Sequence, residues 1–575
     1  MNKLTELFLQ RRGYSPDYLS EIESPAHGNL KDVDILCSRL HAVYEAKTRI
    51  VILPDFDMDG IMSGVLGFAA LAEMGFLVSL FIPTPDKYGF DADVIDRLME
   101  EYPDTKTIIT CDVGSSCFEG VNAAKFKYNL EVLVTDHHTV PKTPVKADVI
   151  VNPLRPDDPY EHKGICGAYV FYQCLQHYAD TYCSVFTREQ ISRLRVFAGV
   201  GTISDSMPVL YENRALVRDA VSICRFVFAE GDENIVNAIP GCNVYRRAFR
   251  GLYEILHMFE DEGKISCPDN IDESFFGFYL APTFNSVKRM NGSMELAFGS
   301  FFSAEREDCI VQLQELNERR KTMVEEYLTR LLESDQPFAP YIYICDAPSG
   351  ILGLLATKIM KLYGVPVIVL KQDEDVNDPN FVLYRGSGRS PEWYPYMDKV
   401  RHNGPAGVTI EGHQLAFGIR MQDFIVPMLY AFLHKDVADV MDTLEVSDEP
   451  YDFVISTVND GDVNIDIPLF RGFVRDIKSL KPFGKGFTEP SVLFRFRLSD
   501  GEVQIIGSNK QHLKINMPYG FNVLCWNQAA AVSQFTSKDA VVSVSGRIEE
   551  NDFQGITSVV FVGEIVNVQE GDKDV

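Results

Sequence analysis

Three short apolar runs in the first quarter of the chain each end in a group of acidic residues or histidines. The runs are VILPDFDMDG (51–60), TIITCDVG (107–114) and LEVLVTDHH (130–138). They alternate with stretches typical of helices, and this alternation predicts a parallel sheet. The carboxyl ends of neighbouring strands in such a sheet line one crevice. We therefore expect the polar groups that follow the three runs to meet there.

The side chains expected in this crevice are of two kinds, carboxylates and imidazoles. They are Asp55, Asp57, Asp59, Asp112, Asp136, His137 and His138. Bare carboxylates at such density repel one another unless cations lie between them. Oxygen and imidazole ligands without cysteine suit Mn²⁺ or Mg²⁺ better than a structural zinc. The pattern thus indicates a site for divalent cations.

The segment DFDMDG has other interpretations when it is taken alone. Asp55 and Asp57 can present their carboxylates together, because alternate residues of an extended segment point to the same side. An acidic turn that caps a helix would have the same composition. The segment also resembles the start of a calcium loop, but Leu66 stands at the twelfth position, where an EF-hand has glutamate.

The rest of the chain predicts a second α/β unit and a β-rich end. Residues 304–335 combine three- and four-residue apolar steps with many charges, which predicts one long helix. YIYICD (341–346) and VPVIVLK (365–371) flank a helical stretch and indicate a smaller α/β unit. After about residue 450, short alternating runs predict a β-barrel or sandwich.

Charge is the feature of the composition that bears most on function. The formal net charge of −28 at pH 7 by itself argues against a nucleic-acid partner. Two divalent cations would add about four positive charges and reverse the local field at the expected site. The 12 cysteines form no C-x-x-C pair, and no apolar stretch reaches the roughly 18 residues needed to cross a bilayer. We expect a cytoplasmic protein without a membrane partner.

Basic and aromatic residues are mixed in residues 469–487, which hold five basic residues and four phenylalanines. Basic groups can follow a phosphate backbone, and aromatic rings can stack on bases. We nevertheless expect these phenylalanines to lie in a core, and likewise Trp526 and Phe553. The segment YRRAFRGLY (245–253) is compatible with a strand-binding face and with an ordinary amphipathic helix.

Four segments in chain order, DFDMDG, CDVGSS, TDHH and GTISD, resemble the motifs of the DHH phosphoesterase superfamily. From about residue 45 to about residue 566, the chain is similar to the RecJ single-strand-specific exonucleases. Three segments look like the DHHA1 subdomain: residues 347–370, GSGRS (386–390) and EGHQLAFG (411–418). KPFGKGFTEP (481–490) looks like the RecJ C-terminal OB-type barrel.

The resemblance implies an α/β fold. A parallel-sheet DHH domain is joined by a long helix to a smaller α/β DHHA1 domain, and a C-terminal OB-type β-barrel follows. The expected boundaries are 1–300 for the catalytic DHH domain with its helical insertion, 301–335 for the connecting helix, 336–445 for DHHA1 and 446–575 for the OB-type nucleic-acid-binding domain.

The resemblance also implies a 5′→3′ exonuclease that hydrolyses single-stranded DNA to nucleotides, by activation of water with two Mn²⁺ or Mg²⁺ ions. The implied metal ligands are Asp55 and Asp112 for one ion, and Asp57, Asp112, His137 and Asp205 for the other. Taken alone, Asp205 would be interpreted as a cap or turn residue. Asp59, Asp136 and His138 are implied as catalytic residues that support the ligands or meet the scissile phosphate.

The implied substrate-binding residues are Lys87, Arg289, Ser387, Arg389 and His413. Around them the chain departs from the family pattern. FIPTPDKYGF (81–90) lacks the family's arginine, so Lys87 would substitute for it; Lys288-Arg289 stands where the family has Gly-Arg; and Glu411 replaces the first glycine of Gly-Gly-His. These departures bear on 5′-phosphate selectivity more than on the chemistry.

Two other functions remain open at this point. A DHH phosphodiesterase acting on short oligonucleotides or cyclic dinucleotides would use the same centre, although it would not need an added binding module. A non-catalytic DNA-binding scaffold would not need so many clustered carboxylates. As partners we expect single-stranded DNA and a single-strand-binding protein or helicase, and we expect a monomer.

Overall fold

The computed structural model divides the chain into two compact units. The described residues are 1–25, 28–82, 89–183, 186–230, 241–373, 382–412, 414–443, 451–458, 460–507, 509–535, 537–553 and 556–569. The larger unit comprises Ala26–Met207 and Asp219–Glu445, and the smaller one Met1–Pro25, Pro208–Arg218 and Val446–Val575. Lys87 and His413 lie outside the described residues.

The larger unit begins with the parallel sheet that the sequence predicts. Its strand order is β2-β1-β3-β4-β5, and all four pairings are parallel. The strands are β1 (Arg49–Pro54), β2 (Val78–Leu80), β3 (Thr105–Cys111), β4 (Glu131–Thr135) and β5 (Val149–Val151). β1 and β3 are almost entirely buried, as expected of apolar strands covered on both faces.

The register of this sheet aligns the residues that follow three strands. Pro54 pairs with Cys111, and Cys111 pairs with Thr135. The ladder continues past the strand ends, because the N–H of Asp55 donates to Cys111 O and the N–H of Asp112 donates to Thr135 O. The acidic residues therefore stand in one row at the carboxyl edge, as predicted.

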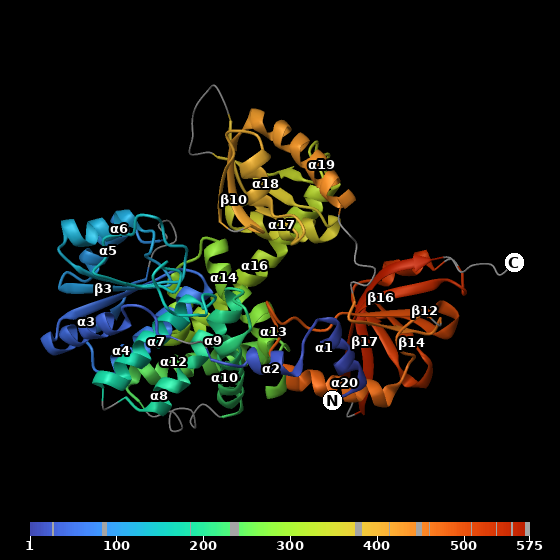
Figure 1. The fold of residues 1–575 in the computed structure, drawn as a ribbon, viewed down its shortest axis with the longest axis horizontal. Helices are drawn as coiled ribbons and strands as arrows, with labels where there is room; N and C mark the ends of the chain where they lie inside the picture. Colours follow the sequence, from blue (N-terminus) through green and yellow to red (C-terminus); the bar gives the residue numbers. More distant parts are fainter. Residues whose placement is uncertain are drawn as a thin grey trace. The chain divides into compact units, whose positions relative to one another are not determined.

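Helices cover both faces of this sheet (Figure 1). On one side lie α5 (Ala92–Glu101) and α6 (Phe118–Asn122), which continues as a π-helix over Ala123–Lys127. On the other side lie α3 (Val33–Ala46), α4 (Met58–Glu73) and α7 (Gly167–Tyr182). α4 is buried along most of its length, because small residues allow its neighbours to approach closely.

The helices that follow in the chain lead to the long helix α16. They are α8 (Arg188–Arg193), α9 (Arg195–Ser204), α10 (Tyr211–Ala229), α12 (Asn243–Asp261), a 3₁₀ turn (Pro268–Asn270), α13 (Glu273–Phe275), a π-helix (Phe276–Leu280), α14 (Ala281–Arg289), α15 (Met294–Phe302) and α16 (Arg306–Glu333). Among them, α9, α12, α14 and α15 contact α4. The long helix predicted over 304–335 is confirmed with 28 residues.

The second α/β sheet has the order β6-β7-β8-β10-β9, with only the β6–β7 pair parallel. Its elements are β6 (Ile342–Ile344), α17 (Ser349–Tyr363), β7 (Val367–Gln372), β8 (Leu383–Arg389), α18 (Tyr396–Asn403), β9 (Thr409–Gly412), β10 (Ala416–Gln422), a 3₁₀ turn (Asp423–Ile425) and α19 (Val426–Thr443). Its buried residues form one apolar cluster with residues of α16, α17 and α19.

The smaller unit carries a seven-stranded sheet of order β11-β12-β16-β17-β15-β14-β13. Its elements are α1 (Lys3–Arg11), α2 (Pro16–Glu21), β11 (Phe453–Ser456), α20 (Ile467–Leu480), β12 (Val492–Arg497), β13 (Glu502–Ile506), β14 (His512–Asn516), β15 (Asn522–Cys525), β16 (Val541–Phe553), β17 (Ile556–Gln569) and 3₁₀ turns at Leu498–Asp500, Pro518–Gly520 and Ala529–Gln534. Among the described residues no pairing joins β13 to β11, so the predicted barrel is an open sheet.

Two expectations about aromatic side chains have different outcomes. The phenylalanines of residues 469–487 are all buried, at no more than 4% exposure, so their assignment to a core is confirmed. Trp526 was expected in the core as well, but it is 51% exposed and meets only the edge of His512 in an aromatic contact. Trp526 follows Cys525, the last residue of β15, so the strand no longer holds its side chain on the inner face of the sheet. The side chain of Phe553 lies outside the described part.

A buried arginine ties three segments of the smaller unit together. Arg214 is 1% exposed, donates to the carbonyls of Pro482 and Leu480 at 2.6 and 2.5 Å, and pairs with Glu23. Its guanidinium also lies over the Phe487 ring.

Among the described helices, none is both long and apolar enough to cross a membrane.

Candidate metal centre and substrate site

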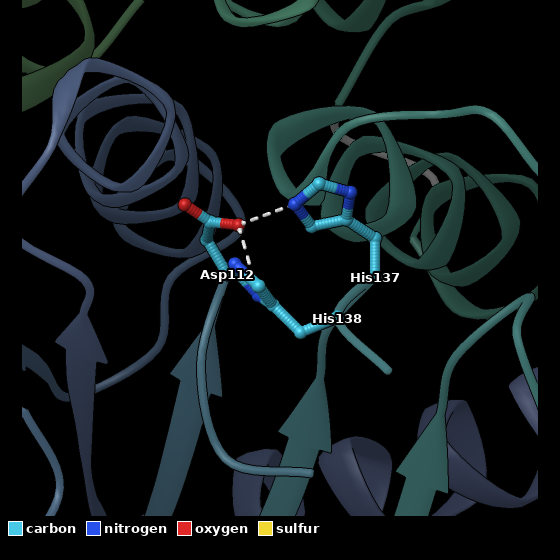
Figure 2. Close-up of side chains that lie close together, drawn as sticks. All are labelled: Asp112, His137 and His138. Carbon is cyan, nitrogen blue, oxygen red and sulfur yellow. Dashed lines mark ion pairs between the residues drawn. The ribbon is translucent and has the colours of Figure 1, made fainter. Parts of the chain in front are cut away.

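Asp112 lies at the centre of the cluster (Figure 2). Its Oδ1 is 3.1 Å from His137 Nε2 and 3.9 Å from His138 Nδ1. The residue is 1% exposed and has a positive φ of 65°, a conformation that costs free energy in a residue other than glycine. Within the described residues, Asp112 Oδ1 accepts no hydrogen bond. The fold thus holds a buried carboxylate oxygen without a donor between two imidazoles.

The N-terminus of α7 holds the carboxylates in place. Asp59 is buried, and it accepts hydrogen bonds from the N–H groups of Gly167 at 2.7 Å and Ala168 at 3.2 Å. Gly167 is required for this approach, because a Cβ there would lie 2.4 Å from Asp112 Oδ1. The sequence motif Cys-Gly-Ala is therefore the point at which α7 packs against the centre.

Three groups of side chains have ligand atoms within 4.8 Å of one another. They are Asp55 with Asp57 and Asp112, Asp59 with His137 and Asp205, and Asp112 with His137 and His138. The structure therefore brings every predicted ligand into one cluster, including Asp205 at the end of α9. It places Asp57 with Asp55, whereas the resemblance implies that Asp57 shares an ion with His137 and Asp205. The assignment of each carboxylate to one ion stays a prediction.

The surroundings of the cluster disfavour the ionised form of its carboxylates. Desolvation, with Asp57 nearby, raises the pKa of Asp55 to about 7. Burial also raises the pKa of Asp59, and burial together with the charge of Asp59 raises the pKa of Asp112 well above its usual value. Groups so close and so poorly solvated retain protons unless positive charge is supplied.

The two histidines differ in charge because their surroundings differ. His137 is 8% exposed, and burial lowers its pKa, so the ring is neutral and has a free lone pair. His138 is half exposed, and its hydrogen bond to Asp136 raises its pKa to about 9. Asp136 in turn accepts hydrogen bonds from the N–H groups of Ser115, His137 and His138. Despite burial, which raises it, the His138 contacts lower the pKa of Asp136 to about 2.

The C-terminal end of α14 brings two cations to the cluster. The helix is anchored at the start of α4, because Asn285 Oδ1 accepts a hydrogen bond from the Met58 N–H at 2.9 Å. Lys288 Nζ lies 3.7 Å from the centroid of the Phe56 ring. Burial, with repulsion from other arginines, lowers the pKa of Arg289 to about 10, although Asp57 raises it.

The predicted phosphate-binding residues are placed by two elements. Ser387 and Arg389 lie two positions apart on β8, so they share one face of that strand. Arg389 packs against α17, where a Cβ on Gly353 would lie 2.7 Å from its Nη2. The charge of Arg389 acts on Arg289, so these two predicted residues are brought within electrostatic range. Lys87 and His413 are outside the described residues.

Two asparagines support the site and were not predicted as site residues. Asn152 Nδ2 donates to Ser115 Oγ and to the His138 carbonyl, both at 2.9 Å. Asn285 holds α14 at the Met58 N–H. Asn152 directly precedes Pro153, and Asn285 ends the segment Pro-Thr-Phe-Asn of α14. Asn152 is fully buried and its amide satisfies two groups, whereas Asn285 is partly buried and acts through one hydrogen bond.

The cluster fits divalent cations. Its donors are carboxylate oxygens and imidazole nitrogens, the set that suits Mn²⁺ or Mg²⁺. A cation at this place would give the unpartnered oxygen of Asp112 a partner. It would also favour the ionised forms of Asp55, Asp59 and Asp112, whose pKa values are raised. The acidic and histidine-rich edge of the first sheet is therefore a centre for divalent cations.

Comparison with known proteins agrees with this geometry. Residues 49–195 match the family model "DHH family, N-terminal domain", and residues 462–563 match the "RecJ OB domain". The chain is 28% identical over 505 residues to the single-stranded-DNA-specific exonuclease RecJ of Haemophilus influenzae, covering 82% of this chain and 79% of that protein. It is 24% identical to the protein of the same name from Escherichia coli, covering 93% of this chain and 90% of that one.

The fold is also that of a solved structure. The crystal structure of RecJ in complex with Mn²⁺ from Thermus thermophilus aligns with a TM-score of 0.71 at 22% identity, covering 100% of this chain and 76% of that one. The two matched regions contain the residues of the cation centre other than Asp205, and most of the C-terminal sheet. The chain is therefore similar to the RecJ exonucleases over most of its length, with one region that matches the DHH family and one that matches the RecJ OB domain.

Proposed function

We propose that the chain is a metal-dependent exonuclease that hydrolyses single-stranded DNA from the 5′ end and releases nucleotides. The observation that carries the proposal is the buried Asp112 oxygen, which meets two imidazoles at the edge of a parallel sheet. The relatives named above are single-stranded-DNA-specific exonucleases. The match to an OB domain supports a polymeric substrate, because OB domains bind single strands over several nucleotides.

The residues divide into ligands and supports. Asp55, Asp57 and Asp112 would hold one cation, and Asp112, His137 and Asp205 the other. When bound, the pair would polarise a water molecule and neutralise charge on the phosphate. His137 is suited to its role because its neutral ring keeps a lone pair, and Asp59 fixes the position of the adjacent backbone from its cap on α7.

His138 is suited to meet the scissile phosphate. It is half exposed, whereas His137 is buried. Its raised pKa of about 9 keeps the ring protonated at neutral pH, so it can donate a hydrogen bond to a phosphate oxygen or a proton to the leaving oxygen. Asp136 orients the ring through the Oδ1–Nδ1 contact of 2.9 Å.

The arginines and Ser387 are proposed to hold phosphates of the strand. Arg289 and Arg389 are both largely desolvated, which lowers their pKa values, and a phosphate would compensate their charges. Lys87 and His413 remain predicted contributors to this site. The predicted domain boundaries at 300, 335 and 445 remain part of the proposal, as do a monomeric state and a single-strand-binding protein or helicase as partner.

Product analysis with labelled strands tests the proposal. A single strand of about 40 nucleotides labelled at its 5′ end should release labelled mononucleotide at once with Mn²⁺, while a 3′ label should remain on long products until late. A dinucleotide and a cyclic dinucleotide serve as competing substrates. Rapid cleavage of these, with the long strand left intact, would support the small-substrate phosphodiesterase and overturn the exonuclease.

A further inference from the structure

Lys288 stands beside the carboxylates of the metal centre. Its ammonium group lies 3.7 Å from the centroid of the Phe56 ring, and Phe56 is the residue between Asp55 and Asp57. An ammonium group over an aromatic face is held by the ring quadrupole. The helix that carries Lys288 is itself fixed by the hydrogen bond between Asn285 and Met58. The charge of Lys288 is thus positioned on the Asp55 side of the centre.

The charge of Lys288 does not act equally on the three groups of candidate cation ligands. The group formed by Asp55, Asp57 and Asp112 contains only carboxylates, whereas the other two groups each contain His137. Lys288 acts electrostatically on Asp55, and the adjacent Arg289 acts on Asp57. Lys288, Arg289 and the half-exposed His138 therefore already act on the group that has no imidazole.

We propose that Lys288 competes with the divalent cation of the Asp55–Asp57–Asp112 group. This cation then binds much more weakly than the one held with His137. The physical reason is Coulomb repulsion between the ammonium group over Phe56, whose charge acts on Asp55, and a dication bound beside Asp55. The inference rests on the metal centre of the proposed function and goes beyond it, since it assigns unequal affinities and names the residue responsible.

Mn²⁺ binding in the absence of DNA is the experiment. The full chain is stripped with chelator, and bound Mn²⁺ is determined by calorimetry and by the electron paramagnetic resonance signal of free Mn²⁺. The unaltered protein should bind two ions with affinities that differ at least about tenfold. Lys288→Gln should tighten the weaker ion at least about fivefold, because it removes the charge. Lys288→Arg, which keeps the charge, should leave both affinities nearly unchanged.

Matched controls separate this effect from damage to the fold. Lys264→Gln removes another lysine that lies near an aromatic ring, 5.6 Å from the centroid of Tyr279, and should change neither affinity. Lys288→Met retains the aliphatic stem over Phe56 and serves as a second neutral variant. In the Lys288→Gln background, Asp55→Asn should abolish the tightened ion. A damaged centre loses cation binding, so a gain in affinity cannot come from misfolding.

Three results would overturn the inference: equal affinities for both ions in the unaltered protein, an unchanged weaker ion in both neutral variants, or weaker strand binding as their sole effect. The last result would instead make Lys288 a phosphate contact. Because the readout needs no hydrolysis, these results leave the exonuclease proposal standing. That proposal fails separately if the Mn²⁺-loaded protein does not degrade single-stranded DNA.

Discussion

Asp112 Oδ1 and His137 Nε2 lie 3.1 Å apart, and the two residues follow adjacent parallel strands, β3 and β4. The pairing of Cys111 with Thr135 sets this distance, because it aligns the positions at which the two strands end. Neither side chain satisfies the other as an ordinary salt bridge, since burial lowers the pKa of His137 and keeps the ring neutral. The geometry of the contact suits two ligands of one cation.

Replacing Asp112 by asparagine should abolish hydrolysis and, in the absence of metal, stabilise the fold. The substitution removes an ionisable group whose pKa is raised by burial while the side chain keeps its shape, and asparagine tolerates a positive φ. We expect hydrolysis of single-stranded DNA to fall to background. The chelator-treated variant should be more stable than the unaltered protein by about 1–2 kcal/mol, because a desolvated carboxylate is lost. Thermal unfolding with and without Mn²⁺ checks this, and an undiminished Mn²⁺-induced rise in Tm would contradict the assignment.

Gly167→Ala tests the packing of α7 against the centre. The added Cβ would lie 2.4 Å from Asp112 Oδ1, so either the helix or the carboxylate must move. We expect a loss of about 1–3 kcal/mol in the free energy of unfolding and a weaker affinity for Mn²⁺. Gly277→Ala is the matched control, because its nearest neighbour, Ile203 Cγ2, is at an ordinary 3.5 Å. Equal effects of the two substitutions on Mn²⁺ affinity would argue against this packing.

The Asp136–His138 pair should make stability depend on pH in the metal-free protein. In the folded protein the pKa of Asp136 is about 2, below its ordinary value. Its contribution to the free energy of unfolding is therefore present above about pH 4 and is lost as the pH falls toward 2. The folded pKa of His138 is about 9, above its ordinary value, so its contribution is complete below about pH 6.5 and is lost as the pH rises through 9.

His138→Gln should therefore cost stability at pH 5.5 and little at pH 10. We expect about 1 kcal/mol at the lower pH, because the half-exposed side chain is screened by solvent. Denaturant unfolding in chelator at both values of pH measures it. His402→Gln, an exposed histidine on α18 that bonds to a backbone carbonyl, is the control. The same loss at both values of pH would mean that the pair is not an ion pair.

Arg214→Ala should destabilise the smaller unit strongly. The guanidinium is buried and bonds to two carbonyls and Glu23, so its removal deprives both carbonyls of a donor and leaves a gap beside Phe487. We expect a loss of about 3–5 kcal/mol, measured by denaturant unfolding followed at the tryptophans. Arg218→Ala removes an exposed partner of the same Glu23 and should cost no more than about 1 kcal/mol. A similar small loss for both would contradict the role given to Arg214.

The sequence was informative wherever a local pattern encodes the result. Alternating apolar runs and helical stretches identified the first sheet, and the order of its strand ends placed Asp55, Asp112 and His137 at one edge. The long helix was found because its apolar spacing is regular over many turns. Helix α20 was not predicted as a helix, although its phenylalanines were expected in a core, where Phe470 and Phe473 are indeed buried.

What the sequence by itself determined is the chemistry of the strand ends: carboxylates and histidines at the carboxyl edge of a parallel sheet, a consequence of local periodicity and of the geometry shared by all such sheets. Only the tertiary structure decided which candidate ligand atoms lie close together, that Asp59 caps α7, that Lys288 lies over Phe56 and that the C-terminal sheet stays open. These features depend on contacts between segments far apart in the chain. Register and packing fix such contacts, and no short stretch of residues encodes them.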